Sequence, residues 1–406
     1  MIWLGVVFCL VAGVQVVYYF FAYSRKTQFS SNKQKDISII VCARNEAENL
    51  RAHIPLWLGQ SVFGARRPTR EPRRTTTTDS ELIIVNDYST DETAEVVGNF
   101  CGADSPVRLL RPPEPTRPGK KDALAYAISQ ARNACLLLTD ADCRPASDRW
   151  AKLMTAPLHD GAALVVGHGA YDASGGSWVG RWQVFAAEHH GLQYRTLTSL
   201  GWTKLGVGRN LAYTKDFFYA RNGMEAHTHL AGGDDDLLLQ TSPMPAVEGA
   251  SEPGGSYQMK KKTGRPAEVQ KNDTVAVIDH PHAWTFSKPA FSWMEYAARK
   301  HRHFSVGRHY TTRSQLILTG LALSHGLFYL LGFLLLFTSW RWWALGIYAL
   351  RMLLVWRAHT KRSAMLPIYD ALLCFYLVWQ VIVTVLARPR QMWEERQPLK
   401  RQTQLE

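Results

Sequence analysis

The sequence predicts an α/β protein with a doubly wound parallel sheet, held at a membrane by apolar segments near both ends of the chain. From Asp36 onward, short continuous apolar runs alternate with amphipathic stretches, as in parallel strands that helices cover on both faces. Apolar runs near both termini are long enough to cross a bilayer. The 406 residues leave room for one large domain besides these segments.

The alternation of apolar and amphipathic stretches gives the order of the elements. The runs that we expect to form strands, the last two being less regular, cover residues 37–41, 82–85, 107–110, 135–139, 164–166 and 274–278. Helices are expected over residues 46–59 and 120–133. Another helix should start within residues 89–93, where Ser and Thr stand beside acidic residues, a composition typical of helix N-termini.

The N-terminal run, residues 2–23, carries no charge and is followed at once by Arg25 and Lys26. It lacks a basic segment before it and a small-residue cleavage site after it, so residues 1–24 are expected to form an uncleaved anchor. Basic residues beside a span favour the cytosol. We therefore expect the N-terminus outside and the domain of residues 36–310 in the cytosol.

The C-terminal membrane region, residues 315–388, contains apolar runs over residues 316–338 and 366–387. A shorter run between them, residues 342–356, carries Arg351, and it fits either a short span or a helix in the membrane interface. Basic residues follow this run and also the last one, in the tail 389–406. Both basic groups cannot be cytosolic if the last run crosses once, so two or three C-terminal spans are compatible with the sequence.

Two segments have the composition of inserted loops, residues 66–79 and 241–273, because both are polar and contain few large apolar side chains. The first of them and the membrane flanks supply much of the net charge of +13. Basic residues beside a span bind anionic lipid headgroups. Since no nucleic-acid-binding motif accompanies the charge, the sequence predicts a lipid bilayer and no nucleic acid as the partner.

The strand at 135–139 ends in Thr139-Asp140-Ala141-Asp142. Two carboxylates two positions apart lie on one face of a strand, and the carboxyl edge of a parallel sheet opens onto the ligand crevice. Hard oxygen ligands there suit Mg²⁺ or Mn²⁺, which can hold a diphosphate. A solvated turn would explain one such motif, but the polar ends of two other strands, at 41–46 and 85–89, are expected at the same edge.

Three polar segments elsewhere also suit a nucleotide site. Asp87 can accept a hydrogen bond from a base or ribose, or cap a helix. Lys120 opens a helix after Gly119, where a phosphate can bind, although solvated lysines are common. The acids at 234–236 repel one another, which raises the pKa of at least one and suits a base at an acceptor hydroxyl, or they cap the helix that follows.

Basic and histidine-rich segments are less specific. The cations at 299–303 can clamp a leaving diphosphate or flank the next membrane span. The histidines at 189–190, 227 and 229 lack the spacing of a zinc site, so we expect structural or solvent-exposed roles for them.

Together, these segments resemble a membrane-anchored inverting glycosyltransferase of family 2, with the nucleotide-diphospho-sugar transferase fold called GT-A. The resemblance extends from about residue 37 to residue 310. It rests on the Ala-Arg-Asn-Glu after the first strand and on the segments 85–91, 119–120, 140–142 and 206–213. It implies a nucleotide-diphospho-sugar donor, Mg²⁺ or Mn²⁺, and a lipid or glycan acceptor.

The resemblance also implies roles for individual residues. Asp234 would be the catalytic base, with Asp235 as its rival because Gly233 replaces the family's Glu. Asp140 and Asp142 would hold the metal ion, Asp142 most directly. The other implied roles are donor binding by Ala43, Arg44, Glu46, Asp87, Lys120, Asp140 and Arg302, and acceptor binding by Arg209 and Asn210.

The expected function is a single sugar transfer at the inner (cytoplasmic) membrane, by a multi-pass protein with its catalytic domain in the cytosol. Residues 299–303 stand where the family often has Gln-x-x-Arg-Trp, and they keep Arg302 but have His303 in place of Trp. In processive polysaccharide synthases that Trp stacks on the acceptor sugar, so its replacement favours single addition. A processive synthase, a metal-dependent nucleotidyltransferase and a non-catalytic nucleotide-sugar binder are the alternatives.

Overall fold

The structure is a computed structural model that describes residues 2–24, 35–64, 78–113, 119–172, 176–230, 232–242, 274–359 and 363–386. The segments with the composition of inserted loops, 66–79 and 241–273, and the basic tail 389–406 lie almost wholly outside the described residues.

Within the described residues, the main sheet has seven strands in the order β3-β2-β1-β4-β8-β6-β9. Their bounds are β1 Ile37–Ala43, β2 Glu81–Asn86, β3 Val107–Leu110, β4 Cys135–Asp140, β6 Leu164–Val166, β8 Leu211–Thr214 and β9 Val275–Val277. β1 pairs in parallel with β2 and β4, and β2 pairs in parallel with β3. This half of the sheet is the doubly wound arrangement expected from the sequence.

One strand corrects the prediction of a purely parallel sheet. β8 runs antiparallel to both β4 and β6, so the sheet is mixed. Leu211, the first residue of β8, pairs with Leu138 near the end of β4. The chain therefore enters β8 at the edge where β4 ends, and from there the strand can only run back. The turn before it, residues 208–210, consequently lies beside the carboxyl end of β4.

A small second sheet adds a wall at this edge. It consists of β5 Cys143–Pro145, β10 Thr285–Ser287 and β7 Gly169–Tyr171, in that order. Because β5 follows β4 after only a short turn, the small sheet lies next to the carboxyl edge of the main one. Segments far apart in the chain thus meet around one edge.

Helices cover both faces of the main sheet. The α-helices there are α2 Ala47–Leu58, α3 Thr93–Gly98, α4 Lys121–Gln130, α5 Trp150–His159, α7 Lys215–Tyr219 and α8 Asp236–Gln240. The described residues also form the 3-10 helices η1 Ser61–Phe63, η2 Gly208–Asn210, η3 Glu225–His227, η4 Pro281–Ala283 and η5 Val306–His309. Ile39 and Val41 of β1 belong to one core with Trp57 of α2, whereas Ile40 belongs to another with Ile128 of α4. Successive strand residues point to opposite faces, so a fully apolar strand needs a helix layer on each side.

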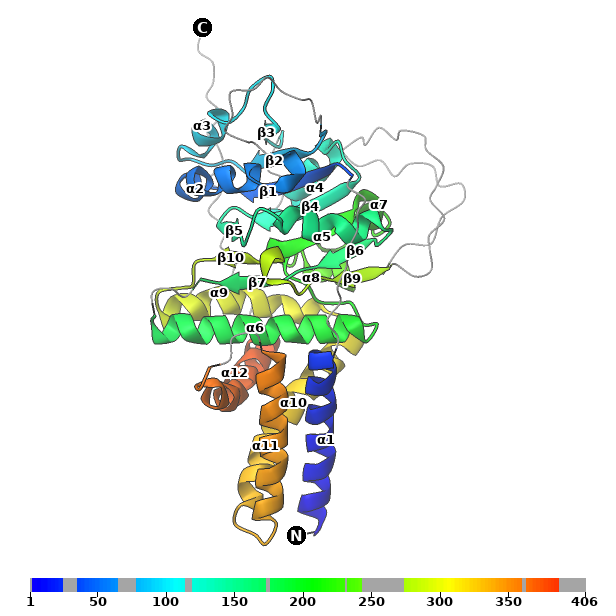
Figure 1. Cartoon of the computed structure of the whole chain (residues 1–406), viewed down its shortest axis with the longest axis vertical. Helices are drawn as coiled ribbons and strands as arrows, with labels where there is room; N and C mark the ends of the chain where they lie inside the picture. The colour runs from blue at the N-terminus through cyan, green and yellow to red at the C-terminus, as the bar shows by residue number, and fades with distance from the viewer. Residues whose placement is uncertain are drawn as a thin grey trace.

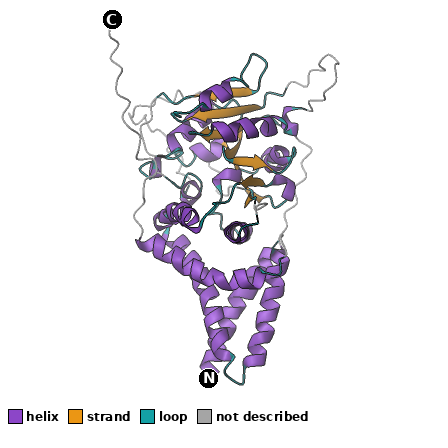
Figure 2. Ribbon diagram, turned by 90° about the vertical axis from the view of Figure 1, so that its left-hand side faces the viewer, coloured by secondary structure: helices purple, strands orange, loops and turns teal. Residues whose placement is uncertain are grey.

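Among the described helices, three are long and apolar enough to cross a membrane, over Ile2–Ala22, Thr312–Leu335 and Leu366–Val385. They fall on α1 Ile2–Ser24, α10 Thr312–Leu335 and α12 Leu366–Leu386, as the apolar runs predict. A further helix, α11 Arg341–Ala358, lies lengthwise beside α1 and α10, whereas α12 lies across the end of these three (Figures 1 and 2). Two long helices, α6 Trp178–Ser199 and α9 Trp293–Ser305, separate the sheets from this region (Figure 1).

Candidate active site

A cleft of about 450 Å³ opens at the carboxyl edge of the main sheet. Strand register explains its floor, because Cys42 of β1 pairs with Asp140 of β4 and Ala43 pairs with Asn86 of β2. All but one of the residues that were expected to have a site role line this cleft, namely Ala43, Arg44, Glu46, Asp87, Lys120, Asp140, Asp142, Arg209, Asp234, Asp235 and Arg302.

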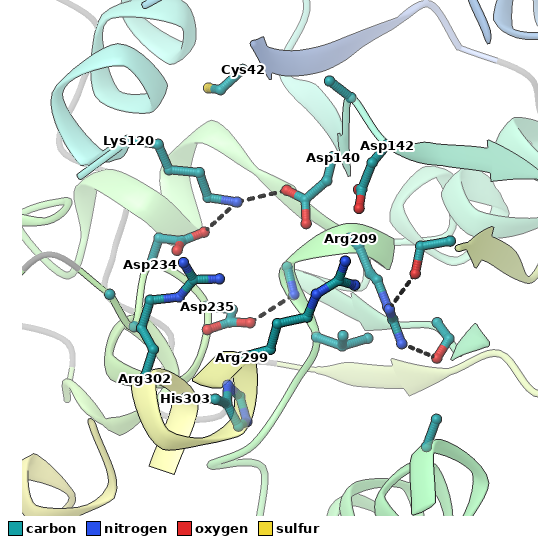
Figure 3. Close-up of a pocket in the computed structure, with 18 of the residues that line it drawn as sticks. Cys42, Lys120, Asp140, Asp142, Arg209, Asp234, Asp235, Arg299, Arg302 and His303 are labelled. Atoms are coloured by element: carbon teal, nitrogen blue, oxygen red, sulfur yellow. Dashed lines mark hydrogen bonds and ion pairs between the residues drawn. The ribbon is translucent and has the colours of Figure 1, made fainter. Parts of the chain in front are cut away.

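Lys120 joins two acids that are far apart in the chain. Its Nζ lies 2.7 Å from Oδ1 of Asp140 and 3.0 Å from Oδ2 of Asp234 (Figure 3). Gly119, which directly precedes Lys120, has a φ of 87°, a conformation that glycine adopts without a steric penalty. Burial alone would lower the pKa of Lys120, but the two carboxylates outweigh it and raise that pKa well above its ordinary value. The ammonium group therefore stays charged in the cleft.

The acids at the end of β4 have the donor set of a divalent cation site. Asp140, Asp142 and Cys143 offer ligand atoms that all lie within 4.8 Å of one another. Burial and the neighbouring Asp142 raise the pKa of the Cys143 thiol well above its ordinary value, and a protonated sulfur is a poor ligand. The two carboxylates remain, and such oxygens fit Mg²⁺ or Mn²⁺.

The pKa values of Asp140 and Asp234 are shifted in opposite directions although both acids contact Lys120. Burial opposes ionisation of Asp140, but Lys120, Arg209 and Arg302 together outweigh it and lower the pKa of Asp140. Burial raises the pKa of Asp234, Lys120 lowers it in part, and Asp235 and Asp140 raise it further, so that the net shift is upward. Asp140 is thus held as a carboxylate, whereas Asp234 binds a proton more readily than an ordinary aspartate.

The acids at 234–236 occupy three different environments. Asp235 accepts hydrogen bonds from the backbone N–H groups of Gly208 and Asp236, each at 2.8 Å. Asp236 is buried and accepts hydrogen bonds from the Gly206 N–H and the Tyr310 hydroxyl. These bonds tie Asp235 and Asp236 to the surrounding backbone, while Asp234 points toward Lys120 across the cleft (Figure 3).

Gly233, which stands in place of the family's Glu, is dictated by local geometry. Its φ is 78°, in the left-handed region that favours glycine. A Cβ atom at this position would lie 2.7 Å from Leu237 Cδ1 and 2.7 Å from Val306 Cγ1. The backbone conformation that presents Asp234 to the cleft therefore has no room for a side chain at position 233.

The structure separates the two residues expected to bind acceptor. Arg209 lines the cleft, where it donates to Ser287 Oγ at 2.7 Å and to the Gly169 carbonyl at 2.6 Å, and its guanidinium lies 4.5 Å from the centre of the Tyr171 ring. Asn210 is the residue that does not reach the cleft, which corrects its expected contact with acceptor.

Asn210 is fully buried on the other side of the same turn. Its Oδ1 accepts from Trp150 Nε1 at 3.0 Å, and its Nδ2 donates to the carbonyls of His168 and Ala283, each at 2.8 Å. Because its amide oxygen and nitrogen are already engaged, Asn210 joins α5, the chain before β7 and η4 rather than facing a ligand.

Helix α9 brings the cations at 299–303 into the cleft rather than leaving them as a flank of the membrane span. Arg299, Lys300, Arg302 and His303 line the cavity. Burial, with Lys300 as the next cause, lowers the pKa of His303 to about 3, so this imidazole is neutral. One side of the cleft is thus acidic, and the side formed by α9 is cationic (Figure 3).

Several residues that line the cleft were given no site role from the sequence. Tyr171 of β7 and Ser287 of β10 sit in three-residue strands, and Tyr194 and His190 come from the long helix α6. The only sequence signal was the His189-His190 pair, to which we gave a structural or solvent-exposed role. Burial and nearby His303 and Lys300 lower the pKa of His190 well below its ordinary value, so a second neutral imidazole lines the cleft.

The comparisons with known proteins agree with this geometry. Residues 38–219 match the family described as Glycosyl transferase family 2. A dolichyl-phosphate β-glucosyltransferase of Trichomonas vaginalis is 29% identical over 138 residues, which are 33% of this chain and 38% of that protein. The chain thus spans well under half of that relative's length.

A solved structure shows the same fold. It is the mannosyltransferase PcManGT from Pyrobaculum calidifontis in complex with GDP-Man and Mn²⁺, 14% identical in sequence, with a TM-score of 0.54 over 95% of this chain and 97% of that one. The fold class expected from the sequence, GT-A, is confirmed, with the mixed sheet described above. We conclude that residues 38–219 form a glycosyltransferase domain that matches family 2.

Proposed function

We propose that the protein transfers one sugar from a nucleotide-diphospho-sugar to a membrane lipid, with inversion at the anomeric carbon. The observation that carries this proposal is the contact of one ammonium group, Lys120 Nζ, with both Asp140 and Asp234. This contact places Asp140, on the candidate metal- and diphosphate-binding side of the cleft, next to Asp234, the candidate base. The membrane acceptor is supported by α6 and α9, whose residues line the cleft and which lie between the sheets and the apolar helices (Figure 1). The dolichyl-phosphate relative also supports it.

The proposed donor site lies at the tips of β1, β2 and β4. Asp87 accepts a hydrogen bond from the base or ribose, beside Ala43, Arg44 and Glu46. Asp140 and Asp142 would hold Mg²⁺ or Mn²⁺, which when bound offsets negative charge on the diphosphate. Lys120 and Arg302 supply further positive charge where the leaving group develops it.

The proposed transfer is a single displacement at the anomeric carbon. Asp234 takes the proton of the acceptor hydroxyl, whose oxygen forms a bond to the anomeric carbon from the face opposite the diphosphate. The bond from that carbon to the phosphate oxygen breaks, and the electron pair leaves with the nucleoside diphosphate. A base with a raised pKa suits this step, because it accepts the proton more readily than an ordinary aspartate.

Asp234 fits the role of base better than its rival Asp235. Both oxygens of Asp235 already accept backbone hydrogen bonds, which hold its side chain at the Gly208 turn, whereas Asp234 faces Lys120 across the cleft. The geometry therefore supports Asp234 as the base and Asp235 as the residue that fixes the turn at Gly208.

The test is a donor screen with the full-length protein in lipid nanodiscs. The reaction contains Mn²⁺, a total lipid extract and each nucleotide sugar in turn, and nucleoside diphosphate release and lipid products are measured. We expect nucleoside diphosphate and one short lipid-linked product. Pyrophosphate release would indicate a nucleotidyltransferase, long polymers would indicate a processive synthase, and donor binding without release of any product would indicate a non-catalytic binder.

A further inference from the structure

We propose that α12 lies along the membrane surface with one apolar face in the lipid, and that α1, α10 and α11 are the helices that cross. By length and composition alone, α12 is a candidate span and α11 is not among the candidates. The packing of the two helices reverses that assignment. This inference concerns the membrane surface and does not depend on the proposed reaction.

Helix α12 touches the catalytic domain along almost its whole length. Near its start, Tyr369 lies 5.3 Å, ring to ring, from Trp178 of α6. Farther along, Trp379 lies 5.4 Å from the ring of Phe304 in α9, and Thr384 Oγ1 donates to the Phe304 carbonyl at 3.3 Å. The stretch from Tyr369 to Thr384 covers about 22 Å, most of the roughly 30 Å hydrocarbon thickness of a bilayer.

Such contacts conflict with a helix that crosses the bilayer. Helix α9, against which α12 packs, carries Arg299, Lys300 and Arg302 into the polar cleft. If α12 crossed the membrane, α9 and these cations would be drawn toward the hydrocarbon, where each charge costs at least about 2.5 kcal/mol. An α12 that lies flat keeps α9 and the cleft on the aqueous side.

The free face of α12 is a single apolar stripe. Its members follow one another at three- or four-residue spacing, are 37–76% exposed, and are Ile368, Leu372, Phe375, Val378, Ile382 and Val385. Leu366, Tyr369 and Leu373 lie on the opposite, buried face. A helix with one face buried against a domain and an apolar face outward is suited to the boundary between headgroups and acyl chains.

Helix α11 has the surroundings of a span. It packs lengthwise beside α1, and its one internal charge, Arg351, is fully buried and paired with the carboxylate of Asp370 at the start of α12. Gln15 of α1 and His325 of α10 also contact the guanidinium, at 3.1 and 3.0 Å. Charges inside a membrane bundle occur in such paired, inward positions.

Aromatic residues mark the far end of this bundle. Trp340, Trp342 and Trp343 lie at the connection between α10 and α11, and Trp340 approaches Gly5 near the start of α1. Tryptophan is enriched at membrane–water interfaces. The connection between α10 and α11 lies at the end of the bundle away from the catalytic domain (Figure 1), so these tryptophans form an aromatic belt at that end.

The assignment also resolves the charge conflict in the sequence. With three crossings, the N-terminus lies opposite the catalytic domain, and the chain returns to the domain's side after α11. Arg357, Lys361 and Arg362 then lie on the same side as Arg388 and Arg390, and both basic groups obey the positive-inside rule. If α12 also crossed, the last group would be outside.

The depth of spin labels in nanodiscs tests the proposal. The exposed Cys9 and Cys101 and the half-buried Cys374 are replaced by alanine. Single cysteines are then introduced in turn at Ile368, Phe375, Ile382 and Val385 of α12, and at Leu345, Leu350 and Leu353 of α11 as the matched spanning control. Power saturation with oxygen and with a nickel chelate then gives each label's depth. We expect one similar, shallow depth for all α12 labels and a graded depth along α11.

Two outcomes would overturn the proposal. A depth gradient along α12 with its deepest point at mid-helix would mean that α12 crosses. Labels that oxygen cannot reach and that broaden one another between molecules would mean that a second copy of the chain, rather than lipid, covers the stripe.

An independent readout uses sealed vesicles with the catalytic domain outward. A C-terminal tag should be removed by added protease, and a cysteine at Ser339, between α10 and α11, should be protected from an impermeant maleimide. A protected tag would contradict the proposed topology.

Discussion

The Lys120 ammonium group lies 3.0 Å from the Asp234 carboxylate, although the two residues come from different helix starts. The same ammonium lies 2.7 Å from Asp140. In the proposed reaction a diphosphate competes for this cation, so donor binding would draw Lys120 away from Asp234. The carboxylate would then be freed to accept a proton at the moment when the donor is in place.

Lys120→Ala should lower kcat/KM for the donor about 10²–10³-fold, because a preorganised positive charge aimed at the leaving group is removed. Steady-state kinetics by nucleoside diphosphate release checks this. Lys152→Ala, an exposed lysine on α5, is the control and should keep full activity. If kcat/KM fell equally in the two variants, the loss would not be specific to Lys120, and Lys120 would have no role in the mechanism.

Asp142→Asn should abolish specific Mn²⁺ binding, since the site would retain one of its two carboxylates. Electron paramagnetic resonance of free Mn²⁺ in a titration of the protein measures this without any turnover. Asp216→Asn, an exposed acid on α7, should leave binding unchanged. Tight Mn²⁺ binding by the Asp142 variant would place the ion elsewhere.

The acidic limb of the pH–rate profile should lie above the ordinary aspartate pKa of about 4. Burial raises the pKa of Asp234, so in the free enzyme the fraction of ionised base falls as the pH drops through this raised value, and kcat/KM falls with it. Since Lys120 partly offsets that shift, the residual activity of Lys120→Ala should show its acidic limb at higher pH still. A limb that does not move between the two proteins would argue against Asp234 as the titrating base.

The same raised pKa has a defined sign for stability. A carboxyl group that is harder to ionise in the folded state favours folding at low pH, and this contribution is lost as the pH rises through the folded pKa.

Gly233 imposes a separate, conformational requirement on the folded state. Gly233→Ala should lower the free energy of unfolding by about 1–3 kcal/mol, because a Cβ meets two side chains and φ is positive.

Thermal unfolding of the Gly233 variant in detergent, compared with Gly98→Ala, measures this effect. A Cβ at Gly98, the last residue of α3, meets nothing within 4 Å, so that control should unfold at an unchanged or slightly higher temperature. Matching Tm values for the two variants would show that position 233 tolerates a side chain.

The strand tips could be predicted because they follow from two simple rules. A continuous apolar run such as 135–139 must be buried on both faces, and the ends of parallel strands gather at one edge. Asp87, Asp140 and Asp142 therefore share a cleft as expected. The position of Lys120 could be predicted in the same way, because a helix that follows a parallel strand begins at this edge of the sheet.

The other wall of the cleft could not be predicted. Tyr171 and Ser287 stand in strands of three residues, which are too short for a periodic pattern. Asn210 was misplaced because adjacent residues of a 3-10 turn point to different sides, and the sequence does not say which side Arg209 takes. The orientation of β8 depends on where the chain enters the sheet, which is a tertiary property.

The most direct test of the central claim compares donor binding and turnover in Asp234→Asn, with Asp216→Asn as the matched acid. Binding of the donor identified by the screen is measured by isothermal titration calorimetry with Mn²⁺, and nucleoside diphosphate release is measured with the lipid extract. We predict that Asp234→Asn binds donor with a Kd within a few-fold of the unaltered protein and loses about 10²–10⁴-fold in kcat. Turnover at the unaltered rate would contradict the assignment of Asp234 as the base.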